Sequence, residues 1–179
     1  YFTPINEISY TAWAGATVVT TVSSEEKATL ATAAGAHHVV NYRTTDAAAE
    51  IRAIVPEGVD LAVDVAIISN AELVSRVLKP RGAVSIYANT GGTEVTLPVR
   101  PFMSLNARLQ FILLYTVGEE ALHSAAEDVT AAVRDRALEV GEEHGLPLIR
   151  YPLEETAAAH DAVENGAVGK VLIDVADLD

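Results

Sequence analysis

Short apolar runs rich in β-branched residues alternate along the chain with longer amphipathic segments that carry polar residues at their starts. The run ATVVTTV at residues 16–22 follows a glycine and predicts a buried strand, because a strand covered on both faces reads as a continuous apolar run. A serine cap and two acidic residues then predict a helix over residues 25–34, which ends at Gly35. The chain therefore begins as an alternation of strand and helix.

The same alternation continues downstream, with a change of pattern beyond Asn89. Further strands are predicted at residues 38–41, 59–65, 83–87, 108–116 and 170–175, with a short extended piece at 93–97. Further helices are predicted at residues 46–55, 69–78, 119–137 and 152–165, and a turn at residues 79–82. Strands that alternate with helices at this spacing predict an α/β fold with a doubly wound, mostly parallel sheet and right-handed crossovers.

The first residues of the chain differ in pattern from the rest. Residues 1–11 have no clear hydrophobic period, whereas the WAG triplet that follows Ala12 reads as the end of a helix. We therefore expect a junction near Ala12, which divides an atypical N-terminal segment (1–12) from the α/β domain (13–179). A strand, a glycine turn and most of a helix are expected to be missing before this point. Residues 6–11 either fill the place of that strand or are foreign to the domain.

Composition excludes several classes of partner and site. The formal net charge of −13 argues against nucleic acid and anionic membrane surfaces, because both require clustered Lys and Arg. The chain has no Cys, which excludes a disulfide, a thiolate zinc site and a Cys nucleophile, and favours a reducing cytoplasm. Charged residues interrupt every long apolar run, so no segment is expected to span a membrane. Residues 1–10 lack the basic start and apolar core of a signal peptide.

Few side chains are arranged for acid–base, nucleophilic or metal chemistry. The neighbours His37 and His38 are expected to point to opposite faces of the chain, and no His-x-x-x-His pair occurs. Adjacent acids such as Glu119 and Glu120 do not face each other on a helix, so we interpret them as solvated charges. No G-x-S-x-G motif occurs, which argues against a serine hydrolase. No metal site and no catalytic side chain are therefore predicted.

Four segments of the chain resemble one family. They are WAGATVVTTVSSEEKATLATAAGAHHVVNYR, VDLAVDV, VLKPRGAVSIYAN and YPLEETAAAHDAVENGAVGKVLIDV. Their order and spacing resemble those of the zinc-independent medium-chain dehydrogenases/reductases, and the NADPH:quinone oxidoreductase branch fits best. The resemblance covers residues 13–175. It implies a Rossmann-type cofactor domain of an NADPH-dependent oxidoreductase, which transfers hydride to a quinone or an activated alkene.

Residues after the first two predicted strands bear on the choice of cofactor. Dinucleotide-binding folds use an acid at the end of their second strand for the ribose 2′-OH of NAD, whereas NADP sites place polar or cationic groups there. Here Ser23, Ser24 and Lys27 follow the strand, and no acid stands at its tip. Tyr42 and Arg43 follow the next strand. Two hydroxyls and an ammonium at a helix N-terminus suit a phosphate.

These residues have two interpretations, a structural one and a phosphate-binding one. From the residues alone, a helix cap at Ser23 and a solvated charge at Lys27 are the simpler explanation. In the family that the chain resembles, the positions of Ser23, Lys27 and Tyr42 hold the 2′-phosphate. The resemblance therefore favours NADPH over NADH.

The resemblance implies further cofactor contacts at the carboxyl ends of later strands. Open α/β sheets bind ligands at this edge, and family members place the nicotinamide and its ribose there. The residues implied are Val65, Ala66, Tyr87, Asn89 and Phe111, together with Gly169 and Lys170, which would close the pocket. For Phe111 and Leu113 burial in the core is the stronger expectation, because strand residues are usually buried.

The chain also departs from the family pattern. No G-x-G-x-x-G occurs, and Gly91 and Gly92 lie after the fourth predicted strand, where they cannot serve as the pyrophosphate turn. The first strand is central in the usual order 3-2-1-4-5-6, so its loss leaves unpaired backbone groups that cost about 1–3 kcal/mol each. The catalytic domain that precedes the cofactor domain in the family is also not matched.

These departures limit the functional expectation. We expect negligible reductase activity from these 179 residues alone, as part of a longer NADPH-dependent enzyme. Residues 108–116 resemble the edge strand through which such enzymes form homodimers. Two alternatives stay open: a non-catalytic binding or assembly module that acts through this strand, and a nucleotide sensor that keeps only the adenosine pocket. The substrate is not indicated, because substrate contacts lie mostly in the unmatched domain.

Overall fold

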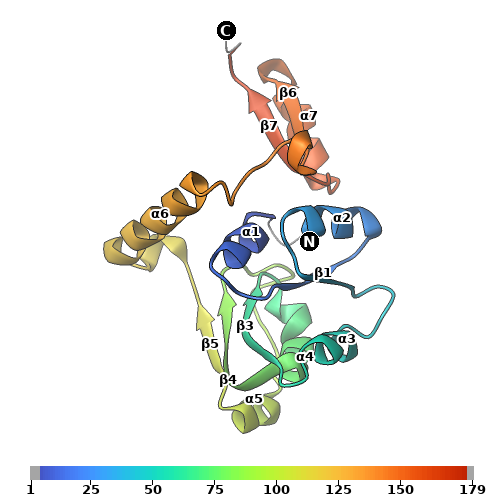
Figure 1. The fold of residues 1–179 in the computed structure, drawn as a ribbon, viewed down its shortest axis with the longest axis vertical. Coiled ribbons are helices and arrows are strands. Elements are labelled where there is room, and N and C mark those ends of the chain that lie inside the picture. The colour runs from blue at the N-terminus through green and yellow to red at the C-terminus, as the bar shows by residue number, and fades with distance from the viewer. Residues whose placement is uncertain (1–4, 177–179) are drawn as a thin grey trace. The chain divides into compact units, whose positions relative to one another are not determined.

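The computed structural model describes residues 5–176, which form two compact units (Figure 1). The terminal unit combines the residues up to Arg43 with those from Val129 onward, and the central unit comprises residues 44–128. Each unit contains helices and paired strands, and every described pair of named strands runs parallel. The predicted α/β class with a mostly parallel sheet is therefore confirmed.

The first part of the terminal unit is a helix–strand–helix–strand segment. Its elements are α1 (Ile5–Trp13), β1 (Val19–Val22), α2 (Glu25–Ala33) and β2 (His38–Asn41). As predicted, a serine begins α2: the Ser24 side chain accepts a hydrogen bond from the Lys27 N–H. The core of this unit consists of small and branched apolar residues, namely Ile8, Val18, Val22, Leu30, Ala31, Ala34 and Leu146.

Helix α1 runs without a break across Ala12, the position of the expected junction. Residues 6–11 are helical, so the expectation that they fill the place of a strand is wrong. Ile8 is buried and Ala12 packs against the same core, at the i, i+4 spacing of one helix face. The period was hard to recognise because Ser9 is also buried, with its hydroxyl donating to the Ala34 carbonyl at 2.8 Å. The division of the chain at residue 12 stays a prediction.

Glu7 on α1 is expected to make the stability of the chain depend on pH. Burial raises its pKa from 4.5 to about 7, although the side chain is only half-buried. The folded chain keeps this proton between about pH 4.5 and 7, where the unfolded chain has lost it. Stability therefore falls as pH rises through this range and levels off above it.

We expect Glu7→Gln to raise the melting temperature at pH 8 and to leave it unchanged near pH 4. Because water screens a half-exposed carboxyl, the gain should be about 1 kcal/mol and not the full value that the pKa shift would imply. Melting curves of both proteins at pH 4, 6 and 8 test this. An equal difference at all three values would show that the carboxyl does not titrate in this range.

The central unit is built on a three-stranded parallel sheet in the order β3-β4-β5. These strands are β3 (Val59–Asp64), β4 (Leu78–Ile86) and β5 (Arg108–Phe111). The helices of the unit are α3 (Ala47–Ile54), α4 (Ile67–Val77) and α5 (Val99–Leu105), of which α4 and α5 pack against the sheet. The buried core between them comprises Ile67, Ala71, Val74, Leu78, Val84, Ile86 and Phe102.

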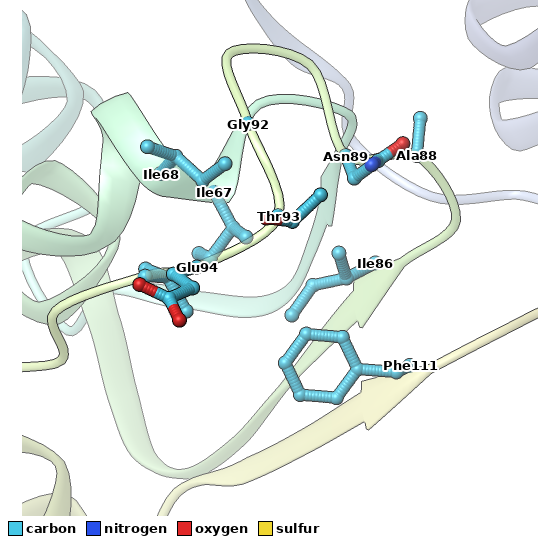
Figure 2. Close-up of a pocket in the computed structure, with 10 residues that line it drawn as sticks. Ile67, Ile68, Ile86, Ala88, Asn89, Gly92, Thr93, Glu94 and Phe111 are labelled. Carbon is cyan, nitrogen blue, oxygen red and sulfur yellow. The ribbon is translucent and has the colours of Figure 1, made fainter.

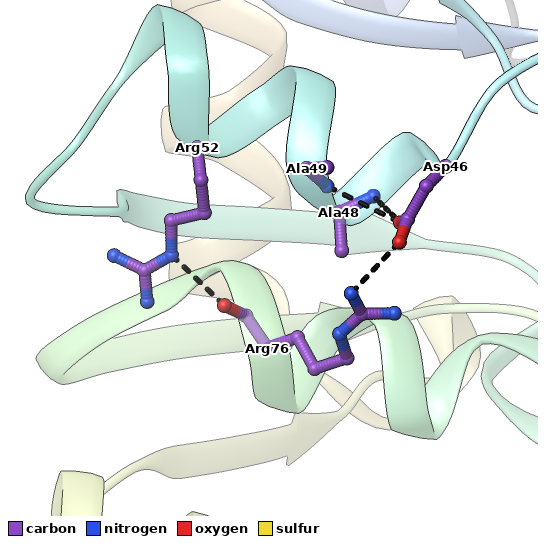
Figure 3. Close-up of polar contacts among 5 residues, drawn as sticks. All are labelled: Asp46, Ala48, Ala49, Arg52 and Arg76. Carbon is purple, nitrogen blue, oxygen red and sulfur yellow. Dashed lines mark hydrogen bonds and ion pairs between the residues drawn. The ribbon is translucent and has the colours of Figure 1, made fainter.

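Two arginines join α3 to α4 (Figure 3). Asp46 begins α3 as predicted, and its Oδ1 accepts hydrogen bonds from the N–H groups of Ala48 and Ala49. Its Oδ2 accepts a hydrogen bond from Arg76 at 3.0 Å, and this bond is the main reason that the pKa of Asp46 lies below its usual range. Arg52 instead donates to three backbone carbonyls, that of Pro56 just after α3 and those of Arg76 and Leu78 at the end of α4.

We expect Arg52→Lys to lower the free energy of unfolding by about 1–2 kcal/mol, because a single ammonium cannot reproduce three forked hydrogen bonds. Arg76→Lys is the matched control, since Arg76 makes an exposed ion pair that is worth about 0–1 kcal/mol. Urea unfolding followed by circular dichroism measures both. Equal effects of the two substitutions would contradict a special role for Arg52.

The observed strands of the central unit differ from prediction at three places. The residues predicted as a turn (79–82) lie inside β4, which pairs Leu78 with Val59 and then shifts register to pair Ala83 with Leu61. Arg81 keeps a turn-like positive φ of 66° within this irregular stretch. β5 ends at Phe111 and not at residue 116, because residues 114–116 turn into a 3-10 helix (η1, Leu114–Thr116). Residues 93–97 form no named strand.

The last part of the chain begins with α6 (Glu119–Arg134), which is slightly shorter than predicted. No helix within residues 5–176 is both long enough and apolar enough to cross a membrane. Beyond α6 lie η2 (Glu142–His144), β6 (Leu148–Pro152), η3 (Leu153–Glu155), α7 (Thr156–Glu164) and β7 (Lys170–Asp174).

The prediction of a helix from residue 152 is wrong at its start, because Pro152 ends a strand. β6 pairs in parallel with β7, and Arg150 forms an ion pair with Asp174 across the pair. The hydrogen bond with Asp174 raises the pKa of Arg150 above its usual value. A strand of five residues that contains Arg and Pro has little apolar signal of its own, so its partner strand decides its conformation.

The sheets are fragments of the usual dinucleotide-binding order. In the order 3-2-1-4-5-6, the pair β2-β1 corresponds to strands 3 and 2, and the triplet β3-β4-β5 corresponds to strands 4, 5 and 6. No described strand corresponds to strand 1. Within the described residues, β1 pairs only with β2 and β3 pairs only with β4. Each of these strands therefore has one edge that no described strand occupies.

Candidate functional site

The carboxyl ends of β1 and β2 lie together at one edge of their sheet. The two strands are parallel, with Val22 opposite Asn41, so the residues that follow them are neighbours. The Tyr42 N–H donates to the Val22 carbonyl at 3.1 Å, which holds Tyr42 beside the start of the loop that leads into α2. The pairing therefore brings together two groups of residues that are separated in sequence by the whole of α2.

This edge gathers the polar residues predicted from the sequence. Ser23, Ser24 and Lys27 lie half-buried at the N-terminus of α2, where Ser24 already caps the helix. Arg43 is exposed, and its N–H donates to the Asn41 side chain at 3.1 Å. The edge thus offers hydroxyls, two cations and a helix N-terminus, a set of groups that suits a phosphate. Glu25 and Glu26, also in the first turn, are exposed.

The central unit has a pocket of about 150 Å³ at the carboxyl ends of β4 and β5 (Figure 2). Its walls come from the start of α4, the end of β4, the loop that follows β4, and β5. The lining residues are Ile67, Ile68, Ile86, Ala88, Asn89, Gly92, Thr93, Glu94, Val95 and Phe111. Open α/β sheets bind ligands at this end of their strands.

The pocket is mainly apolar. In Figure 2 the Phe111 ring lies beside Ile86, while Ile67 and Ile68 approach from α4. Asn89, Thr93 and Glu94 supply its polar groups. An apolar cavity with a few polar groups at its rim is the common form of a small-molecule site.

Phe111 and Leu113 are not core residues, so the stronger of the two sequence interpretations is wrong for them. They are 63% and 59% exposed. β5 is an edge strand within the described residues. The alternative interpretation, that Phe111 contributes to a ligand pocket, agrees with its place in the wall.

The other residues predicted for the nicotinamide end do not line the pocket. Val65 and Ala66 join β3 to α4, and Tyr87 follows β4. Gly169 and Lys170 belong to the terminal unit, where Lys170 begins β7 opposite Leu148. The structure therefore brings Asn89 and Phe111 together in one pocket and distributes the remaining residues around the strand ends.

Of the residues that line the pocket, sequence reasoning found only Asn89 and Phe111. Ile67 and Ile68 lie just before the helix predicted from residue 69, and Glu94 lies in the short extended piece predicted at residues 93–97. The pair Gly91 and Gly92, both with positive φ, folds the loop back toward α4, and its position directly after a strand was the available signal.

No group of three or more His, Asp or Glu residues that could hold a metal ion occurs within residues 5–176, and the chain has no Cys. The described donor set therefore does not fit a zinc site.

Comparison with known proteins identifies the family. The family model for zinc-binding dehydrogenases matches residues 6–143. A 2-haloacrylate reductase from a Burkholderia species is 33% identical over 148 residues, which are 82% of this chain but only 44% of that protein. The chain thus spans less than half the length of this relative.

Solved structures give the same fold. A quinone oxidoreductase from Pseudomonas syringae pv. Tomato DC3000 matches with a TM-score of 0.80 at 19% identity, over 96% of this chain and 53% of that one. Escherichia coli quinone oxidoreductase, solved with NADPH, matches with a TM-score of 0.77 at 22% identity, with the same coverage of 96% and 53%. These likenesses support the Rossmann-type fold, and the sequence match is decisive for the family: the chain belongs to the zinc-binding dehydrogenases, within the medium-chain dehydrogenases/reductases.

Proposed function

We propose that this chain is the cofactor-binding part of an NADPH-dependent oxidoreductase that reduces a quinone or an activated alkene. One observation carries the proposal: hydroxyls and cations, with no acid at the tip of β1, gather where β1 and β2 end. An acid at that tip is what an NAD site uses for the ribose 2′-OH. Relatives named as a 2-haloacrylate reductase and quinone oxidoreductases, one of them solved with NADPH, support the same choice.

The residues have distinct roles in this proposal. Ser23, Ser24, Lys27, Tyr42 and Arg43 hold the 2′-phosphate and the adenosine. Once bound, the cofactor supplies the hydride, and the protein supplies orientation and a dry pocket. The family takes its name from zinc binding, but the side chains of the described residues do not form a zinc-binding group. The proposal therefore involves no metal.

The nicotinamide end belongs, in this proposal, to the central pocket. Asn89 and Phe111 line it, and its apolar walls suit the planar, uncharged ring of the reduced cofactor. The residues expected around this end are Val65, Ala66, Tyr87, Asn89 and Phe111. No side chain of this chain is proposed as a catalytic acid or base, since hydride transfer depends mainly on placement.

The chain spans less than half of its reductase relative. The activity of the whole enzyme, its small-molecule substrate and its oligomeric state are therefore proposals. We expect negligible turnover from this chain alone and a homodimer through residues 108–116. Within the described residues β5 pairs on one side only, and Leu114 and Tyr115 beside it are exposed. A cytoplasmic location also stays a prediction. The same free edge is the observation that favours the second candidate, a non-catalytic assembly module.

Thermal melting with and without millimolar NADPH, with NADH as the control, tests the proposal. At 100 times its dissociation constant, a ligand should stabilise the fold by about 2.7 kcal/mol. A rise in melting temperature with NADPH and not with NADH is the expected result. No rise with either cofactor would reject the proposal and leave the assembly module as the better account.

A further inference from the structure

Asp64, the last residue of β3, is a buried carboxylate that the functional proposal has not used. It is 8% exposed. Its Oδ1 accepts a hydrogen bond from the Ala66 N–H at 2.7 Å, and its Oδ2 accepts one from the Asn70 side chain at 2.8 Å. The carboxylate thus holds both the turn that leaves β3 and the first turn of α4.

This arrangement replaces an ordinary helix cap. Ala66 occupies the N-cap position of α4 and has no side chain that could accept a hydrogen bond. A carboxylate near a helix N-terminus is also stabilised by the helix dipole. Asp64, at the end of β3, instead accepts hydrogen bonds from Ala66 and Asn70 at the start of α4. The orientation of the first turn of α4 therefore depends on the Asp64 side chain.

The part of α4 held in this way forms one wall of the central pocket. Ile67 and Ile68, which directly follow Ala66, are lining residues. The opposite loop is tied to the same turn, because the Thr90 N–H donates to the Val65 carbonyl at 3.1 Å. Two walls of the pocket therefore meet at the turn that Asp64 holds.

We propose that Asp64 is a positioning residue for the nicotinamide end of the cofactor site, acting through the α4 wall and the loop after β4. This inference rests on the proposed function. If it is right, loss of the Asp64 hydrogen bonds weakens the binding of a ligand that reaches the central pocket. Binding of a ligand that occupies only the adenosine part of the site is unaffected.

The test compares two probes on the same chain. NADPH carries the nicotinamide, whereas adenosine 2′,5′-bisphosphate carries only the adenosine and its 2′-phosphate. Asp64→Asn removes the negative charge from this pair, so the hydrogen bonds that hold the start of α4 lose their charge-assisted strength even if the Asn70 amide turns over to accept from the new amide. We expect about tenfold weaker NADPH binding and unchanged bisphosphate binding by titration calorimetry.

Two further variants separate positioning from folding. In the double variant Asp64→Asn with Asn70→Asp, the amide at position 64 can donate to the new carboxylate, so NADPH affinity should return to within about twofold of the wild type. Asp60→Asn makes the same change on the same strand at an exposed residue, which pairs with Lys79 on β4. It should change neither affinity.

Each outcome has one meaning. If the wild-type chain binds NADPH no more tightly than the bisphosphate, the proposal that the central pocket binds nicotinamide is itself rejected. If NADPH binds more tightly but Asp64→Asn leaves that difference intact, only the positioning role fails. The positioning role would also be rejected if affinity for both probes fell equally, or if the double variant did not recover its affinity for NADPH. Asp64 would then contribute only to folding.

Discussion

Leu78→Ala is expected to lower the free energy of unfolding by about 3–5 kcal/mol, the largest single effect on stability that we predict. Leu78 has no exposed surface and joins the end of α4 to the start of β4. It also lies against Gly82, where a Cβ would come within 2.7 Å of the Leu78 Cγ. A chain that turns this tightly around a side chain cannot collapse to fill the cavity, so the substitution should approach the upper end of the range.

Leu61→Ala is the matched control for this prediction. Leu61 lies in the neighbouring strand β3 and is 54% exposed, so the same loss of methyl groups should cost less than about 1 kcal/mol. Urea unfolding followed by circular dichroism is the suitable measurement, because the only Trp, Trp13, lies in the terminal unit. If the two substitutions had similar effects, the core of the central unit would be loosely packed.

Lys27→Glu is expected to weaken NADPH binding by about 100-fold or more. The variant removes a cation from the edge where β1 and β2 end and places a carboxylate near the proposed 2′-phosphate. Two like charges about 4–5 Å apart near a protein surface repel by about 3–4 kcal/mol, which exceeds the 2.7 kcal/mol of a 100-fold change. NADH has no 2′-phosphate, so its weak binding should not decrease.

Lys79→Glu reverses a charge in the central unit, which contains none of the residues of the proposed phosphate site, and controls for the change in net charge. Titration calorimetry with both cofactors measures the effect. A raised salt concentration should reduce the difference between wild type and Lys27→Glu, because exposed charges are screened. Similar losses in the two variants would mean that the overall charge, and not a local phosphate site, controls NADPH binding.

The sequence was sufficient for elements whose signals are local. A serine caps α2 as the pattern predicted, although it is Ser24 and not Ser23, Asp46 caps α3, and β2 has the predicted bounds. Caps and continuous apolar runs depend on residues within one or two turns of each other, so one stretch of sequence contains the whole signal. The edge that we propose to bind the cofactor phosphate could be located for the same reason, because its residues directly follow two such strands.

The sequence was insufficient where distant residues decide the conformation. Pro152 ends a strand because β7 pairs with β6, and residues 79–82 join β4 through a register shift against β3. Phe111 is 63% exposed although it lies in a strand, which the local apolar pattern did not indicate. These outcomes depend on pairing and packing between segments that a local pattern does not connect.

The sequence by itself therefore determined the α/β class, the order of most elements and the family, and it pointed to the residues that we propose to bind the cofactor phosphate. Only the tertiary structure decided that Ile67, Asn89 and Phe111 share a pocket and that Asp64 holds one of its walls. The physical reason is the parallel sheet: it aligns the ends of strands that lie far apart in sequence. A site at those ends consists of residues whose nearness appears only when the strands have paired.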